Sequence, residues 1–183
     1  SIDKITKSMD YDVESTSYFF HPEKSNNKLV IYHQGHDGGF VNGKETIDFF
    51  LKNNYTVMAF SMPLLGMNSQ PVVEIPDLGA VKLESHDHLY FLDSTKFSPL
   101  KYFVEPIAVS LNYVDEHFDF DSYYMVGISG GGWTTTLYSA IDPRITQSYS
   151  VAGSLPTYLR SSPNDLGDYE QINPDLYHVA NYI

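Results

Sequence analysis

The pattern of apolar and polar positions predicts alternating strands and helices. Short runs rich in β-branched and aromatic residues predict strands, and residues 28–33 are apolar enough to be buried on both faces. Apolar residues at three- and four-residue spacing predict amphipathic helices. The expected strands are residues 11–20, 28–33, 55–62, 123–127 and 147–153, and the expected helices are residues 43–53, 102–117 and 133–141. This order predicts an α/β fold in which a doubly wound, mostly parallel sheet forms a three-layer sandwich with helices on both faces.

One segment interrupts this alternation. Residues 63–101 contain four prolines that break any long helix or strand. A connection of this length in a compact domain is usually functional, so we expect an irregular insertion or a lid-like segment. The chain of 183 residues has no internal repeat and no linker, which predicts a single domain over residues 1–183.

The sequence Gly127-Ile128-Ser129-Gly130-Gly131 stands where an expected strand ends and a helix follows. A serine that attacks a carbonyl must stand at the tip of a sharp, strained turn, and glycine two residues before and after it relieves crowding. The following helix directs free N–H groups and the positive end of its dipole at the serine. An ordinary glycine-rich phosphate loop is the alternative, but no lysine follows as a Walker-type loop requires. The pattern therefore favours a nucleophile elbow.

Together with a second loop, this motif resembles the α/β-hydrolase superfamily, in its esterase-like branch. The loop His33-Gln34-Gly35-His36 follows an earlier strand and is similar to the oxyanion loop of that family. The resemblance implies a serine hydrolase that forms an acyl-enzyme on a small-molecule carboxylic ester. Ser129 would be the nucleophile, and the backbone N–H groups of Gly130 and His36 would hold the oxyanion. It implies no cofactor and no metal.

The resemblance also implies an acid and a histidine after the nucleophile. The family's seventh strand is expected to begin near residues 181–183, so we expect an incomplete domain whose C-terminal part is missing. The base and the acid would then lie outside this chain, in missing sequence or in a second chain. A rival arrangement uses His178 as the base, with Asp165, Asp168 or Glu170 behind it. A histidine just before a strand would lie at the wrong end of the sheet for this role.

Two other functional classes remain open at this stage. A peptidase of the prolyl-oligopeptidase type shares the elbow and would cleave dipeptide amides. A non-catalytic binding protein can also be built on a hydrolase scaffold, and it would lack a functional histidine.

The formal net charge of −12 argues against nucleic acid and anionic membrane surfaces as partners. The absence of cysteine excludes a disulfide framework and a thiolate metal site, and it leaves the cellular compartment open. No apolar run approaches the ~20 residues that span a bilayer.

The sequence His86-Asp87-His88 lies within the irregular segment. Two histidines with an aspartate between them can bind a metal, with His33, His36 and Asp37 as more distant helpers. The spacing matches no established zinc signature, so the sequence favours a solvated loop or a place near the mouth of the active site.

Overall fold

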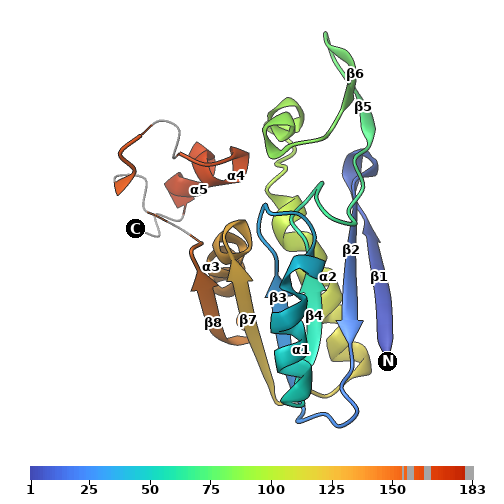
Figure 1. The fold of residues 1–183 in the computed structure, drawn as a ribbon. Coiled ribbons are helices and arrows are strands. Elements are labelled where there is room, and N and C mark those ends of the chain that lie inside the picture. The colour runs from blue at the N-terminus through green and yellow to red at the C-terminus, as the bar shows by residue number, and fades with distance from the viewer. Residues whose placement is uncertain (154, 156–158, 163–165, 180–183) are drawn as a thin grey trace.

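The computed structural model describes residues 1–153, 155, 159–162 and 166–179, with the side chains of 177–179 excepted. A six-stranded sheet with the order β1-β2-β4-β3-β7-β8 forms its centre (Figure 1). The strands are β1 (Ile2–Ser8), β2 (Glu14–Phe20), β3 (Lys28–His33), β4 (Thr56–Phe60), β7 (Ser122–Ile128) and β8 (Ile145–Val151). β1 and β2 run antiparallel to their neighbours, and β4, β3, β7 and β8 are parallel. The predicted mostly parallel sheet is confirmed.

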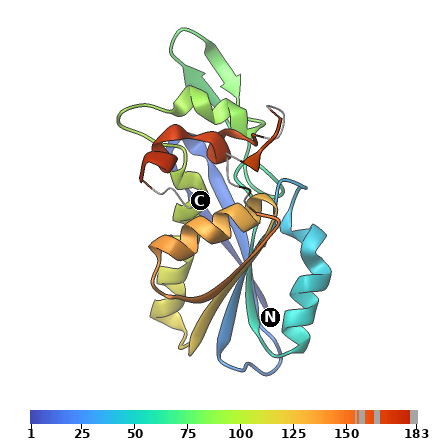
Figure 2. The ribbon, with the colours of Figure 1, turned by 90° about the vertical axis from the view of Figure 1, so that its left-hand side faces the viewer.

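The helices cover both faces of the sheet, as Figure 2 shows from the side. The helix α1 (Lys44–Lys52) lies on one face, where Ile47 packs with β3 and β4. The helices α2 (Lys101–His117) and α3 (Gly130–Ile141) cover the other face, where Ile107 and Leu111 join a buried cluster with residues of β3, β4 and β7. Burying apolar side chains from both faces of the central strands is the main favourable contribution to folding. The three-layer sandwich is therefore confirmed.

The parallel pairing determines which loops meet. His33, the last residue of β3, pairs with Phe60 of β4 and with Gly127 of β7. The loops that follow these strands therefore begin side by side at the carboxyl edge of the sheet. In parallel α/β sheets this edge is where ligands bind.

The N-terminal part of the chain differs from what the sequence predicts. β1 was not predicted, because six of its seven residues are polar or exposed and only Ile5 packs against the core. The strand expected over residues 11–20 begins only at Glu14, since Asp10–Asp12 form a 3-10 turn, η1. A second 3-10 turn, η2 (Phe40–Gly43), precedes α1.

The segment 63–101 is more regular than expected. It contains the hairpin β5 (Val72–Ile75) and β6 (Gly79–Lys82), followed by the 3-10 helix η3 (His86–Leu92). After β8 come two short helices, α4 (Tyr169–Ile172) and α5 (Pro174–Val179). The hairpin, η3, α4 and α5 lie beyond the carboxyl edge of the sheet in both views (Figures 1 and 2). The seventh strand expected near 181–183 falls outside the described residues.

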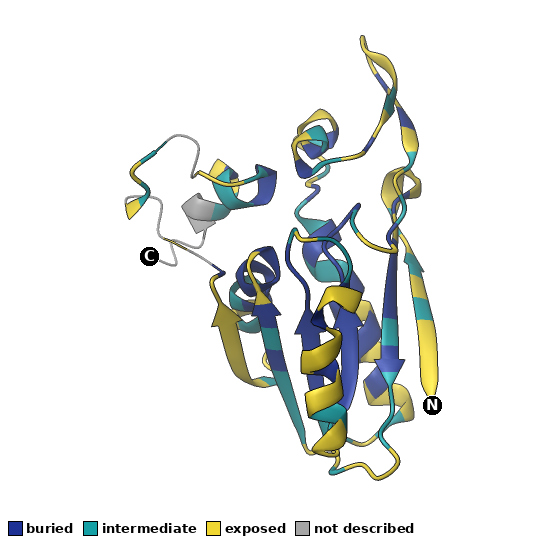
Figure 3. Cartoon of the chain, in the orientation of Figure 1, coloured by how far each residue is buried: buried dark blue, intermediate teal, exposed yellow. Residues whose placement is uncertain are grey.

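The outer strand β8 is exposed along nearly its whole length, in contrast to the buried central strands (Figure 3). Beside it, on the face that carries α1, lies a cavity of about 440 Å³. Its lining residues are mostly apolar or aromatic: Val30, Phe50, Tyr55, Tyr124, Val126, Gln147 and Tyr149. This cavity lies over the sheet rather than at its carboxyl edge. Within the described ranges, no helix has the length and apolar character that crossing a membrane requires.

Candidate active site

Ser129 lies at the junction of β7 and α3, where it is the N-cap residue of α3. Its backbone adopts φ 54° and ψ −123°, and its side chain is exposed. Its N–H donates a hydrogen bond of 2.8 Å to the carbonyl of Val151, and its own carbonyl accepts from Trp133 N–H at 3.1 Å. A non-glycine residue with positive φ is strained and persists only where its surroundings hold it. The turn therefore presents the hydroxyl beyond the sheet, as the motif predicts.

Residues 127 and 131 must be glycine, because neither position has room for a side chain. A Cβ atom on Gly127 would lie 2.1 Å from the carbonyl oxygen of Gly131, and one on Gly131 would lie 2.2 Å from the carbonyl oxygen of His33. Both distances are far inside van der Waals contact, so any side chain would force the strand, the turn and the helix apart. The spacing seen in the sequence thus has a direct steric cause.

The loop after β3 approaches the turn just as closely. A Cβ atom on Gly35 would lie 2.7 Å from Ser129 Cβ and 3.2 Å from the backbone nitrogen of Gly130. The imidazole of His36 packs on Gly130. The structure therefore brings Gly35, His36, Ser129 and Gly130 together, although they come from two loops more than 90 residues apart.

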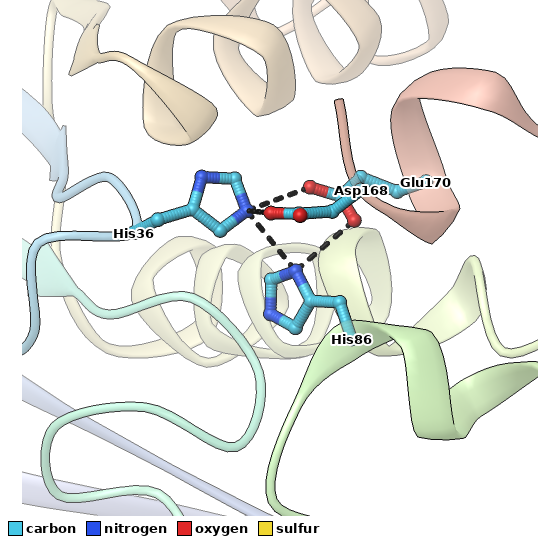
Figure 4. Close-up of side chains that lie close together, drawn as sticks. All are labelled: His36, His86, Asp168 and Glu170. Carbon is cyan, nitrogen blue, oxygen red and sulfur yellow. Dashed lines mark hydrogen bonds and ion pairs between the residues drawn. The ribbon is translucent and has the colours of Figure 1, made fainter. Parts of the chain in front are cut away.

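Around the His36 ring lies a cluster that the sequence analysis did not assemble. His36 Nε2 is 2.9 Å from Asp168 Oδ2, 2.9 Å from Glu170 Oε1 and 3.1 Å from His86 Nδ1 (Figure 4). His86 Nδ1 is also 3.0 Å from Glu170 Oε2. The members come from the loop after β3, from η3 and from the start of α4. We call these four residues the His/acid cluster.

Hydrogen bonding shifts the pKa values of the His/acid cluster in the direction that favours ion pairs. Burial alone would lower the pKa of His36, but its hydrogen bonds to Asp168 and Glu170 raise that pKa to about 9. Burial alone would raise the pKa of Glu170, yet hydrogen bonds to His36 and His86 lower it to about 2. Hydrogen bonding to His36 also lowers the pKa of Asp168. In this arrangement His36 is cationic at neutral pH, and both acids are ionised.

Several expectations need correction. His86 is not in a solvated loop: it is 4% exposed, and its Nε2 donates to the carbonyl of Pro63 at 2.9 Å. His88 lies apart, with its Nδ1 3.0 Å from the carbonyl oxygen of Lys82 and 3.1 Å from the backbone nitrogen of Glu84. Asp168, an acid of the rival arrangement, contacts His36, and Glu170, another of its acids, contacts both His36 and His86.

The remaining candidates are placed as follows. His178 lies in α5, but its side chain is outside the description, and Asp165 is also among the residues that are not described. His33 is buried, and its Nδ1 donates to the carbonyl of Gln34 at 2.9 Å. Burial lowers the pKa of His33 to about 4, so it is neutral at physiological pH.

Comparison with known proteins shows the fold. No protein-family model and no curated protein matches the chain. Among solved structures, the Pyrococcus furiosus esterase Pf2001 matches with a TM-score of 0.59 and 12% identity, over 84% of this chain and 49% of that chain. Est1E from Butyrivibrio proteoclasticus matches with a TM-score of 0.57 and 16% identity, over 93% and 60%. The thioesterase domain from the curacin biosynthetic pathway matches with a TM-score of 0.56 and 16% identity, over 90% and 49%.

The chain therefore has an α/β-hydrolase-like fold, as the resemblance implied. It spans about half the length of the solved structures that it matches.

Proposed function

We propose that the protein is a serine hydrolase that cleaves a carboxylic ester, or a related acyl substrate such as a thioester, through an acyl-enzyme. Ser129 Oγ attacks the substrate carbonyl and gives its proton to a histidine base. The base passes that proton to the leaving group, and water then hydrolyses the acyl-enzyme. No cofactor takes part in these steps.

The backbone of Ser129 carries this proposal. Holding a serine at φ 54° costs of order 1–3 kcal/mol, and a turn without function would relieve that cost with glycine. The strain is instead retained at an exposed serine, with a glycine two residues before it and another two residues after it. Ser129 is the N-cap residue of α3, a helix of 12 residues. The free N–H groups of this helix favour developing negative charge.

The oxyanion would be held by the backbone N–H groups of Gly130 and His36. Gly130 begins α3, where N–H groups have no partner within the helix. The close approach of Gly35 to Ser129 supports the pairing of these two segments, because it leaves no room for a side chain between them. Removing one such donor from a serine hydrolase typically costs about 10²–10³ in rate.

We propose that the base and its acid come from outside the described residues, on the same polypeptide or on a second chain. His36 does not fit this role, because it already carries a proton at neutral pH when it pairs with Asp168 and Glu170. His33 is buried, and its Nδ1 proton is donated to a backbone carbonyl.

Pre-steady-state hydrolysis of p-nitrophenyl acetate and p-nitrophenyl butyrate by the complete native protein, together with any second chain that co-purifies with it, tests this function. We expect a burst of about one p-nitrophenol per chain, followed by slower turnover, and loss of the burst in Ser129→Ala. Ser139→Ala serves as the control, because this serine lies farther along α3. A burst that survives in Ser129→Ala would overturn the assignment.

The same preparation separates the two alternatives. Cleavage of a dipeptide amide faster than of short esters would favour a prolyl-oligopeptidase type of peptidase. Absence of turnover on both substrate classes, together with a folded protein, would favour a non-catalytic binding protein on a hydrolase scaffold.

A further inference from the structure

We propose that His36, His86, Asp168 and Glu170 form a binding site for one divalent transition-metal ion, with Zn²⁺ as the best match. One ligand atom from each residue lies within 4.8 Å of the others. Figure 4 shows the four side chains converging from three segments of the chain. The proposal departs from the sequence expectation of a protein without metal, and it does not depend on the chemistry of Ser129.

The hydrogen bond made by His86 identifies the nitrogen that faces the cluster. His86 Nε2 lies 2.9 Å from the carbonyl oxygen of Pro63, and a carbonyl only accepts, so Nε2 carries the hydrogen. In neutral imidazole the other nitrogen, Nδ1, then has a lone pair, which is directed at Glu170 and His36. Histidines that bind metals commonly donate their second nitrogen to a carbonyl or carboxylate in this way.

No arrangement of protons on the four side chains gives every close contact of the cluster a hydrogen bond. His36 Nε2 carries at most one hydrogen, but it faces Asp168, Glu170 and His86 within 3.1 Å. With His86 neutral, its lone pair points at a carboxylate oxygen 3.0 Å away. With both imidazoles protonated, two N–H groups meet across 3.1 Å. A cation at the centre removes both conflicts, because all four atoms then donate lone pairs to it.

The dimensions and donor types select the class of metal. Tetrahedral Zn²⁺ with bonds of about 2.0–2.2 Å places its ligand atoms roughly 3.3–3.5 Å apart. The closest contacts in the cluster, 2.9–3.1 Å, need to open by a few tenths of an ångström, and the wider separations, which reach up to 4.8 Å, need to close around the ion. Two imidazoles with two carboxylates suit Zn²⁺ better than Mg²⁺ or Ca²⁺, which prefer oxygen ligands alone.

The surroundings provide support on one side and access on the other. Glu170 is fully buried and His86 is 4% exposed, whereas nearly half of the Asp168 side chain is exposed. A cavity of about 160 Å³ reaches His36, His86 and Asp168 from the surface, and the acids Glu84 and Asp87 also line it. This negative mouth attracts a cation and gives it a path to the ligands.

Four protein ligands leave no open position, so the site is structural rather than catalytic. The ion would join the loop after β3 to η3 and to the start of α4, two segments that already pack through the rings of Tyr90 and Tyr169. Since the ring of His36 also packs on Gly130, the ion would hold the loop after β3 against the elbow.

The test uses metal content and binding as readouts. The purified protein is stripped with a chelator, its fold is checked by circular dichroism, and Zn²⁺ is titrated by calorimetry. We expect about one ion per chain, and a rise of several degrees in Tm on adding Zn²⁺ that a chelator reverses. The stripped protein should also bind Co²⁺ with the intense visible absorption of tetrahedral coordination.

Variants then locate the ion. His86→Ala and Glu170→Gln should each weaken Zn²⁺ binding by at least about 100-fold, whereas the control His88→Ala should not change it. Asp168→Asn provides a second ligand variant at a partly exposed position, in case the buried variants do not fold. Folded wild-type protein without stoichiometric Zn²⁺ binding would overturn the proposal. Binding that is unchanged in the folded ligand variants would overturn it as well.

Discussion

The imidazole of His36 lies directly against Gly130: a Cβ atom on Gly130 would come within 2.3 Å of His36 Cε1 and 2.5 Å of Nδ1. This contact joins the start of α3 to the His/acid cluster. One histidine thus contacts the first residue after Ser129 and, through Nε2, both acids of the cluster. The elbow and the cluster are therefore neighbours, although no local sequence pattern connects them.

Alanine at Gly130 and at Gly131 should have unequal effects. At Gly131 the new Cβ would meet the backbone carbonyl of His33 at 2.2 Å, and the backbone cannot yield without opening the sheet. At Gly130 it would meet side-chain atoms of Met62 and His36, which can move, although displacing His36 disturbs its contacts with Asp168 and Glu170. Alanine also gains about 1 kcal/mol in helix propensity over glycine. We expect Gly131→Ala to lose about 3 kcal/mol or more of stability, and Gly130→Ala clearly less.

Denaturant unfolding of both variants checks this order, with m-values compared to exclude a change in the unfolded state. Gly130→Ala should still reduce the reactivity of Ser129, because His36 is displaced from the elbow. Equal losses of stability in the two variants would contradict the steric account.

Replacing Ser129 by glycine should stabilise the fold. Its φ of 54° is strained for serine and free of strain for glycine, and the side chain is exposed, so little packing is lost. The relief of strain exceeds the entropic cost of glycine, and we expect a gain of about 1 kcal/mol. Ser129→Ala is the matched control, since alanine keeps the strain. Thermal unfolding in which the glycine variant is no more stable than the alanine variant would show that the turn is not strained.

The order of elements was predictable because it depends on local pattern. The runs at 28–33 and 123–127 are apolar since they lie inside a parallel sheet. β1 was missed because its side chains are mostly polar or exposed, so its pairing with β2 leaves no apolar signature.

The His/acid cluster was not predictable in the same way. His36 lies 50 residues from His86 and 134 residues from Glu170, so only tertiary structure brings these three residues together. The available signals were His86-Asp87-His88 and the acids around residue 170, each of which is ordinary in an exposed loop. The sequence favoured solvation for His86, whereas the chain buries it and bonds it to Pro63.

Asn68 should be essential to the connection after β4. Its Oδ1 accepts from Thr16 N–H at 2.7 Å, and its Nδ2 donates to the carbonyls of Met62 and Ser61 at 2.7 and 3.3 Å. Asn68→Asp keeps the shape but turns an ionised oxygen toward two carbonyls, so we expect a loss of about 2–4 kcal/mol. The exposed Asn53→Asp is the control. Unfolding free energies that agree within error for the two variants would refute this role.

His33 should make the protein sensitive to acid. Burial lowers its pKa from 6.5 to about 4, so the unfolded state binds the proton more readily between these values. Stability is therefore complete above about pH 6.5 and is lost as the pH falls toward 4, with a loss of roughly 2 kcal/mol at pH 5 from this residue.

The variant His33→Asn isolates this effect, because its amide retains an N–H for the carbonyl of Gln34 but does not titrate. The drop in unfolding free energy between pH 7 and pH 5 should be smaller in the variant than in wild type. Other histidines titrate in both proteins and cancel in this difference. Identical drops would show that His33 is not held neutral by burial.

Covalent labelling of the complete native protein with a fluorophosphonate, followed by mass spectrometry of the digested protein, tests the central claim most directly. The account predicts one adduct per chain, located on Ser129, which disappears when the protein is denatured before labelling and is absent in Ser129→Ala. Labelling on another serine of the folded protein, or no labelling of Ser129 when the fold is intact, would contradict the claim that this turn presents an activated nucleophile.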